Sequence, residues 1–501
     1  MPLQEKNKKS NFFRKLFSPV DLTTGKIYKV ILIFALPIII SYVLQQIYTI
    51  SDAAIIGQTL SADEVAGVND TTSLVFIFLQ FAFGASAGFC VITARKIGAN
   101  DEAGARKSFA AQIVLCTGIS VVLTVLSLFL LDPMLAWLNV MPDSGVIYQS
   151  AHLYCAVIFA GIGAQMFYNF ICSFLRSLGD SFTPLVFLFF STLLNIALDL
   201  MFIILFKWGV FGAAIATVAA QLISTLACFV YTFVKYKFLR LHAEDFRLSK
   251  NELRAHLSQG LPLGLQFSVL AIGIIVMQSC VVKFDILDGT MISNAAQNGF
   301  GAANKLNNFM MTPMMALGSA MTSFNAQSLG AGYKDRVKKG SNQSVLMMLI
   351  VCAILIGIGF LCTVNGAYLY LFLSADKVTN ETIRYGNNLL YVDFSLYILL
   401  AMIFSMRNCV QGIGKSEFVL GAGAAELIAR VTICLLLPAA INGGAIDANA
   451  SNAAYIALCF ADPLAWLASD SVLIFPYVKH ILRNDYKYLE TTKTKQKQIN
   501  E

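Results

Sequence analysis

The sequence predicts an all-α polytopic membrane protein with twelve transmembrane helices in two six-helix bundles, related by a pseudo-twofold axis along the membrane normal. Composition, twelve long apolar stretches and repeated loop motifs lead to this prediction. Of the 501 residues, 57% are hydrophobic and 13% are charged, about half of the usual charged share of about 25%. Because a soluble chain of this length needs a larger charged shell, the composition excludes a soluble enzyme, a disordered scaffold and a secreted disulfide module.

Each apolar stretch is long enough to cross the hydrocarbon core, which requires about 20 residues of helix. Backbone amides inside lipid must be paired within the chain, and long continuous runs favour helices over a barrel of short alternating strands. We expect twelve spans, at residues 28–57, 70–93, 109–131, 152–174, 184–206, 211–234, 261–283, 300–323, 344–366, 389–410, 418–440 and 453–478.

The distribution of Lys and Arg sets the expected orientation, since these residues hold loops on the cytoplasmic side. Thirty of the 36 fall in alternate loops and at both ends of the chain. We therefore expect a multi-pass protein of the cell membrane with a cytoplasmic N-terminal segment (1–27) and a cytoplasmic tail (479–501). The first 17 residues lack a cleavage site, so they favour a basic anchor over a signal peptide or an interfacial amphipathic segment.

Short motifs recur at near-constant offsets along the chain. Gly98 after the second span aligns with Gly330 after the eighth at an offset of 232, and Gly179 aligns with Gly414 at an offset of 235. Six spans per half give the two halves one orientation, and substrate would bind between them as they rock. The expected units are a first lobe at 28–234, a basic cytoplasmic linker at 235–258 and a second lobe at 259–478.

Motifs for catalysis and metal binding lack support. All 11 cysteines lie within apolar stretches and form no CxxC pair, and the four histidines lie near span ends, which disfavours a zinc site. The segment from Gly84 to Gly88 matches GxSxG, but it lies inside the second span, where small residues serve close helix packing. We expect no enzyme activity, no tightly bound cofactor and no nucleic-acid partner.

Polar side chains within spans are costly unless they face partners or a cavity. Asp52, Asp199 and Thr217 lie at one depth to within about 3 Å, counted from the outer ends of spans 1, 5 and 6. Asn195 shares a helix face with Asp199. Ionised, these oxygens could coordinate Na⁺; alternatively, one carboxyl group could carry a proton. The structural alternative is that Asp52 caps a helix while Asn195 and Asp199 join helices.

Several segments resemble the multidrug and toxic compound extrusion (MATE) transporters, in the right order over nearly the whole chain. The resemblance implies cation-coupled antiport and a coupling site at Asp52, Asn195, Asp199 and Thr217, with Asn169 as a further family amide. The matching segments are Ala35-Leu-Pro37, Ser51-Asp-Ala-Ala-Ile-Ile-Gly57, Gly98-Ala99, Arg176-Ser-Leu-Gly-Asp180, Leu194-Asn-Ile-Ala-Leu-Asp199, Gly209-Val-Phe-Gly-Ala-Ala-Ile-Ala-Thr217 and Gln411-Gly-Ile-Gly-Lys-Ser416.

The second half departs from part of the family. Some members carry an acidic pair in spans 7 and 10, whereas Gln266 and Leu400 stand at the corresponding positions here. We therefore expect the first lobe to couple the ion. Pro37 removes a backbone hydrogen bond and permits a bend in span 1, so cation entry would rearrange that span and expel substrate.

The expected substrates are amphipathic, often cationic organic compounds, which suit adaptable apolar surfaces. Most Phe and Met side chains would nevertheless serve packing or face lipid. Glu426 and Arg430 favour a structural ion pair at their i, i+4 spacing, and we expect Lys305 to pair with an acid of the same lobe. Candidate cavity residues are Gln45, Gln46, Gln266, Lys305, Met310, Met314, Glu426 and Arg430; Asp462 and Asp470 also lie within span 12.

One alternative is a flippase for lipid-linked precursors or polysaccharides, of the same wider superfamily. That function requires a basic cavity for phosphates, whereas only Lys305 and Arg430 lie deep in the spans. A major-facilitator transporter also has six plus six spans, but Gly98 to Lys107 match its loop repeat poorly. The expected partners are the lipid bilayer and small organic substrates, the protein is expected to be a monomer, and the coupling ion is H⁺ or Na⁺.

Overall fold

The computed structural model describes residues 18–138 and 140–486. The predicted basic anchor within residues 1–17 and most of the predicted tail lie outside the described residues. The helices are α2 (Ile27–Thr59), α3 (Ala62–Gly98), α4 (Glu102–Phe129), α5 (Leu131–Trp137), α6 (Val146–Ala160), α7 (Ile162–Ser177), α8 (Phe182–Asp199), α9 (Gly209–Lys235), α10 (Lys250–Val282), α11 (Ala295–Gly330), α12 (Lys334–Thr363), α13 (Asn380–Ser395), α14 (Tyr397–Gly412), α15 (Ser416–Asn442), α16 (Asn452–Cys459) and α17 (Ala461–Pro476).

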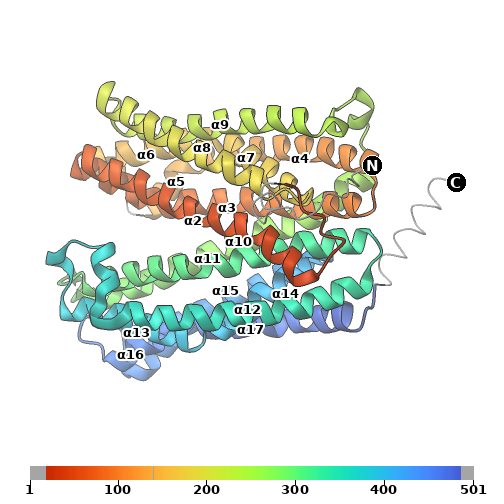
Figure 1. Ribbon diagram of the computed structural model, residues 1–501. Coiled ribbons are helices and arrows are strands. Elements are labelled where there is room, and N and C mark those ends of the chain that lie inside the picture. Colours follow the sequence, from red (N-terminus) through yellow and green to blue (C-terminus); the bar gives the residue numbers. More distant parts are fainter. Residues whose placement is uncertain (1–17, 139, 487–501) are drawn as a thin grey trace.

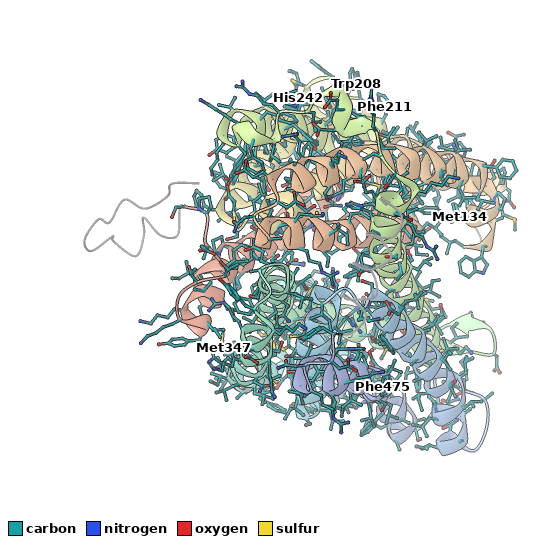
Figure 2. All side chains as sticks on the ribbon, turned by 90° about the vertical axis from the view of Figure 1, so that its right-hand side faces the viewer. Met134, Trp208, Phe211, His242, Met347 and Phe475 are labelled. Carbon is teal, nitrogen blue, oxygen red and sulfur yellow. The ribbon has the colours of Figure 1, made fainter. Side chains whose placement is uncertain are left out.

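The helices form two lobes that lie side by side (Figure 1). Helices α2 to α9 build the first lobe and α11 to α17 the second, while α10 packs against α3 of the first lobe and α15 of the second. Large apolar side chains cover the outer surface, including Phe475 and, at the edge of the view in Figure 2, Trp208 and Phe211. Such a surface suits lipid tails rather than water.

Within the described ranges, nine single helices and two bent pairs are long and apolar enough to cross a membrane. The remaining expected span, the eighth at 300–323, corresponds to α11, whose 36 residues suffice in length but include many amides. Because 22 of these residues are buried, α11 contacts neighbouring helices more than lipid and needs less hydropathy. Its neighbours are α2, α3, α12, α13 and α14.

Spans 4 and 10 are bent, a feature that the continuous apolar stretches did not predict. Helices α6 and α7 meet at 45°, and α13 and α14 meet at 56°. At the first bend a Cβ on Gly161 would lie 2.3 Å from Val218 Cγ2, so glycine permits that close approach. In span 1, by contrast, Pro37 permits a bend, but α2 runs through it as one helix. Ser41 Oγ donates to the Pro37 carbonyl at 2.8 Å.

One small departure from the all-α expectation follows α10. The strands β1 (Ile286–Leu287) and β2 (Thr290–Met291) form an antiparallel hairpin in which Ile286 pairs with Met291 and Leu287 with Thr290. Asp288 and Gly289 both have positive φ, the backbone that a two-residue hairpin turn requires. The hairpin only caps the loop between α10 and α11.

The predicted packing role of Gly84 and Gly88 is confirmed. A Cβ on Gly84 would lie 2.6 Å from the Leu263 carbonyl oxygen, and one on Gly88 would lie 2.5 Å from that of Gln259. Across the interface a Cβ on Gly260 would lie 2.8 Å from the Ala85 carbonyl oxygen, and one on Gly264 would lie 3.0 Å from that of Phe81. Two small-xxx-small motifs, one from each helix, therefore join α3 to α10 by backbone contact.

The ends of α3 and α11 meet reciprocally, as a pseudo-twofold axis requires. A Cβ on Gly98 would lie 2.0 Å from the Gln327 carbonyl oxygen, and one on Gly330 would lie 2.1 Å from the Arg95 carbonyl oxygen. The 232-residue offset that relates Gly98 to Gly330 also relates Arg95 to Gln327. The axis therefore passes between these two helix ends, at the end of the bundle that carries the basic loops.

Gly98→Ala is expected to destabilise the contact between the lobes by about 1 to 3 kcal/mol, because the added methyl group forces two backbones apart. Thermal unfolding of the purified protein in detergent measures this as a lower midpoint. Gly118→Ala is the matched control, since nothing lies within 4 Å of its Cβ position and alanine favours a helix interior. Equal midpoints for wild type and Gly98→Ala would contradict the reciprocal contact.

The linker between the lobes is fixed to α4 by a buried ion pair. Arg106 Nε donates to both carboxylate oxygens of Asp245, at 2.9 and 2.8 Å, and Asp245 is 3% exposed. Burial alone would raise the pKa of Asp245, but the His242 backbone N–H and the Arg106 guanidinium outweigh it and hold this pKa below the ordinary value of 3.8. The ion pair therefore stabilises the linker at neutral pH.

Asp245→Asn is expected to lower the free energy of unfolding at pH 7 by about 1 to 3 kcal/mol, since it removes a charge-assisted hydrogen-bond pair. A carboxyl group with a depressed pKa stabilises the fold above its unfolded pKa of about 3.9 and loses this effect as pH falls through the folded pKa. Thermal midpoints of wild type and variant should thus differ from pH 8 to about pH 5 and converge only in stronger acid. Convergence near pH 6 would exclude Asp245 as the cause.

Candidate functional site

Two carboxylates face each other within the first lobe. Asp52 on α2 and Asp199 at the end of α8 lie close enough for their charges to interact, and the Asn195 side chain adjoins Asp199 one turn earlier on α8. Thr217 on α9 lies beside the Tyr48 hydroxyl group, which itself adjoins both carboxylates. The structure thus brings Asp52, Asn195, Asp199 and Thr217 together from three helices. We call these four residues the acidic cluster.

The apolar layer next to the cluster shows that its members share one depth. Ile56, Ile203 and Ala213 belong to one buried hydrophobic group, with exposed fractions of 5%, 5% and 1%. Each lies four residues, about one helical turn, from a member of the cluster: Asp52, Asp199 and Thr217 respectively. Because the three apolar residues meet, the three polar ones lie at one level on the adjoining turn.

A change of helix type follows Asp199 directly. Helix α8 ends at this residue, and Leu200–Leu205 continue as a π-helical turn. Wide turns of this kind shift the register of a helix and occur often at functional sites. Here the wide turn lets α8 carry Asp199 toward α2 while Ile203 still packs in the apolar layer.

The polar atoms of the cluster are buried without hydrogen-bond partners among the residues that the structure describes. Both carboxylate oxygens of Asp199, both polar atoms of the Asn195 amide and the Thr217 hydroxyl are enclosed and unpaired, as is one oxygen of Asp52. Asn195 and Asp199 are fully buried. An unpaired buried polar atom costs about 1 to 3 kcal/mol. The cluster therefore suits an occupant that supplies positive charge or hydrogen-bond donors.

Two tyrosines of this site were missed from the sequence. Tyr48 lies one turn before Asp52 on α2, and the Tyr154 ring on α6 stands near both carboxylates. The i, i+4 spacing of Tyr48 and Asp52 was a usable signal. Tyr154 offered none, because only the fold brings α6 beside α2 and α8.

Asn169 is the remaining predicted coupling residue. It lies on α7, 8% exposed, and its amide nitrogen has no hydrogen-bond partner in the described part of the chain. No hydrogen bond joins it to the acidic cluster within the described residues. Its place in the coupling site stays a prediction.

A cavity of about 850 Å³, counting the part open to solvent, lies between the lobes. Of the predicted cavity residues, Gln266 lines it, fully buried and with both polar atoms of its amide unpaired. Gln45, which is exposed, and Gln46, which is half-buried, lie on α2 outside the lining. The lining comes from α2, α3 and α7 on one side and α10, α11 and α14 on the other.

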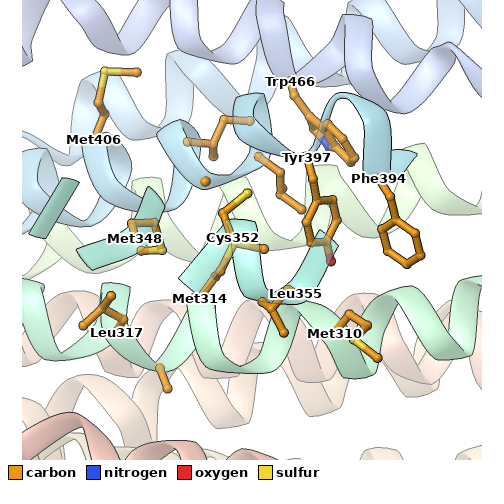
Figure 3. Packing of buried hydrophobic residues seen from close by; sticks show 14 of the residues in the cluster. Met310, Met314, Leu317, Met348, Cys352, Leu355, Phe394, Tyr397, Met406 and Trp466 are labelled. Carbon is orange, nitrogen blue, oxygen red and sulfur yellow. The ribbon is translucent and has the colours of Figure 1, made fainter. Parts of the chain in front are cut away.

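Met310 and Met314 pack inside the second lobe instead of facing this cavity. Their exposed fractions are 6% and 0%, and they lie among the residues of the buried core that include Cys352 and Tyr397 (Figure 3). The neighbouring Met315 is the residue that reaches the cavity wall. A one-residue step along a helix turns the side chain by about 100°, which the sequence alone did not resolve.

The expectation that Lys305 pairs with an acid of its lobe is wrong. Lys305 is exposed, and its Nζ lies 5.9 Å from the centre of the Phe372 ring. Within the described residues no ion pair includes it. A cation–π contact with Phe372 replaces the expected ion pair.

Glu426 and Arg430 belong to a larger ion network across α14, α15 and α17. Glu426 accepts from Arg407 Nη2 at 2.7 Å and from Arg430 Nη2 at 3.3 Å. Arg430 Nε also donates to Asp462 at 2.9 Å. The preferred interpretation of Glu426 and Arg430 as a structural pair fits this geometry, because these side chains are enclosed by protein and neutralise each other. Asp470 lies near Arg407, with one oxygen buried and unpaired.

No group of three or more His, Cys, Asp or Glu side chains could hold a metal ion in the part of the chain that the structure describes. The acidic cluster contributes two carboxylates, one amide oxygen and one hydroxyl. These are hard oxygen donors that suit Na⁺ or a proton rather than a transition metal.

Two pseudo-symmetric helical lobes, a cavity between them and an unpaired acidic cluster within one lobe define a secondary transporter. Comparisons with known proteins agree. The MatE family model matches residues 37–201 and 271–436, so the chain belongs to the multidrug and toxic compound extrusion family. As members of that family are transporters, it is a multi-pass membrane transporter of the multidrug-efflux type and not an enzyme.

The relatives cover most of the chain. The probable multidrug resistance protein YpnP of Bacillus subtilis is 32% identical over 63% of this chain and 68% of its own. A FAD transporter of Shewanella oneidensis is 26% identical over 66% of this chain and 71% of its own. The outward-facing structure of a multidrug resistance MATE family transporter matches with a TM-score of 0.77 at 20% identity, covering 92% of this chain and 97% of its own. These matches confirm the predicted family and the fold of twelve spans in two bundles.

Proposed function

We propose that the protein exports amphipathic organic compounds by antiport with a cation, H⁺ or Na⁺, which binds at Asp52, Asn195, Asp199 and Thr217. The observation that carries this proposal is the pair of facing carboxylates, Asp52 on α2 and Asp199 on α8, whose buried oxygens lack partners. Two negative charges that face each other in a poorly hydrated site repel each other strongly. An arriving cation removes the repulsion and draws α2 toward α8.

Alternating access needs two conformations, and the contacts between the lobes indicate which of the two this structure represents. The lobes touch through Gly98 and Gln327 at the end that carries the basic loops. With both termini cytoplasmic, as the basic loops favour, this arrangement is closed toward the cytoplasm. Cation binding on α2 would then bias the lobes between this state and its opposite, because α2 also packs against α11 of the second lobe. One copy contains both lobes and the cluster, so a monomer suffices.

Export driven by separate ion gradients tests the proposal. Purified protein is reconstituted in liposomes, a fluorescent amphipathic dye is loaded, and a Na⁺ gradient or a pH gradient is imposed alone. We expect one of the two gradients to drive dye movement and Asp199→Asn to abolish it. Dye movement that neither gradient accelerates would sink the antiport proposal and favour a precursor flippase.

A further inference from the structure

Two arginines stand on the wall of the cavity between the lobes. Arg176 reaches it from the end of α7 and Arg407 from the end of α14. The described lining residues include no carboxylate and no lysine. From the sequence, both arginines were interpreted as loop charges that set the topology. The expected substrates were often cationic, whereas the charged side chains of the lining are positive.

Arg176 lacks a counterion among the described residues. No ion pair includes it within residues 18–138 and 140–486, its Nε is buried without a partner, and its guanidinium centre lies 5.7 Å from the centre of the Tyr42 ring. The acid nearest in sequence, Asp180, is held by Lys235 and Tyr236, each at 2.7 Å. A half-buried cation without a counterion is costly, so a ligand anion would be strongly favoured beside it.

Arg407 is fixed in place on the facing wall. Its Nη2 donates to Glu426 at 2.7 Å and to Ser469 at 3.3 Å, which orients the guanidinium plane, while its Nε is buried and unpaired. The side chain is 10% exposed. A guanidinium group carries five N–H donors in a rigid fork that matches carboxylate and phosphate oxygens. The contacts to Glu426 and Ser469 occupy only one of its three nitrogens.

The rest of the wall is aromatic and uncharged. Phe83, Phe267 and Phe404 offer flat apolar surface, and the fully buried Gln266 presents an amide whose two polar atoms have no partner. Such a wall suits an aromatic body that carries one or two polar groups. Phosphate headgroups of lipids share the anionic chemistry but lack a ring for this aromatic wall.

We propose that this cavity binds the anionic group, carboxylate or phosphate, of an aromatic amphipathic substrate between Arg176 and Arg407. The transported compounds then include aromatic anions and zwitterions as well as cations. This inference rests on the proposed function, because it names the substrate class of the same transporter. The coupling cation would bind at the acidic cluster, and the anionic group of the substrate would bind at the arginine pair.

A matched pair of dyes tests the charge preference directly. Tetramethylrhodamine carries a free carboxylate, and its methyl ester has the same ring system without that charge. Fluorescence anisotropy with purified protein in a non-ionic, phosphate-free detergent gives the Kd of each. We expect the carboxylate form to bind to the wild type at least tenfold more tightly than the ester. Arg176→Gln should remove this preference by raising the Kd of the acid while leaving the Kd of the ester unchanged.

Further variants control for misfolding, and a lipid competitor tests whether the arginines bind a lipid headgroup instead. Arg176→Gln leaves no carboxylate unpaired, so it should fold, and Arg176→Lys should keep part of the preference. Arg240→Gln removes one exposed linker charge and should change neither Kd. A short-chain phosphatidylglycerol is added as competitor to the bound dye. Competition at lower concentration than the free rhodamine acid would assign the arginines to a lipid headgroup and overturn the inference.

The outcomes separate this inference from the proposed function. Equal Kd values for acid and ester, tighter binding of the ester, or no binding of either dye would overturn the arginine site, even if an ion gradient drives export of another compound. A clear preference for the acid that Arg176→Gln abolishes, with no gradient-driven transport, would keep the anion site and remove the antiport. The two proposals therefore fail in different measurements.

Discussion

Asp199→Asn and Asp52→Asn are each expected to reduce gradient-driven export to the level of protein-free liposomes while leaving substrate binding within about twofold. Each variant keeps the size of the side chain and removes one of the two charges that the coupling cation neutralises. With one charge gone, the repulsion between α2 and α8 is permanently relieved, so the ion gradient no longer shifts the equilibrium between conformations. Asp143→Asn, an exposed loop residue, is the matched control and should export normally.

The other two members of the cluster distinguish the ions. Na⁺ needs several oxygen ligands, so Thr217→Val and Asn195→Ala should weaken Na⁺-driven export by about tenfold or more. A proton needs only one carboxylate, and the same variants should leave pH-driven export largely intact. Transport by Asp199→Asn at wild-type rates under either gradient would remove the acidic cluster from coupling. Equal loss in all four variants under a pH gradient would instead indicate that each residue positions the protonated carboxyl group.

The sequence carried most of the fold and of the acidic cluster, because both rest on local patterns. Twelve apolar stretches and a 232-residue offset are properties of the chain read in order, and the offset reappears as the reciprocal contact of Gly98 and Gly330. Depth along a span follows from counting residues, so Asp52, Asp199 and Thr217 could be placed at one level. Rotation about each helix could not be read with the same certainty, as Met310 and Met314 illustrate.

Features that depend on contacts between distant segments were not predictable. The bend after α6 depends on Val218 approaching Gly161, and the burial of most of α11 depends on how closely its neighbours enclose it. Arg176 and Arg407 carry no signal in the sequence that separates a cavity wall from a cytoplasmic loop. Only the meeting of α7 and α14 across the cavity shows their common surroundings.

Glu426→Ala is expected to destabilise the second lobe by about 3 to 5 kcal/mol, which can prevent the protein from accumulating. Glu426 is 5% exposed and contacts both Arg407 and Arg430. Its removal leaves two buried guanidinium groups without their shared counterion, and breaking a buried pair costs far more than forming it contributes. Thermal unfolding in detergent and the yield of folded protein on a sizing column measure the loss.

Two comparisons test whether charge, and not lost volume, causes this instability. Glu417→Ala removes the partner of an exposed pair, Lys415 at 3.2 Å with Glu417 55% exposed, and should cost no more than about 1 kcal/mol. The combined replacement of Glu426, Asp462 and both arginines by Met should recover most of the stability of the wild type, since buried ion networks can be exchanged for apolar packing. The same variant also removes Arg407 from the cavity, so the stable protein should have lost its preference for the rhodamine acid.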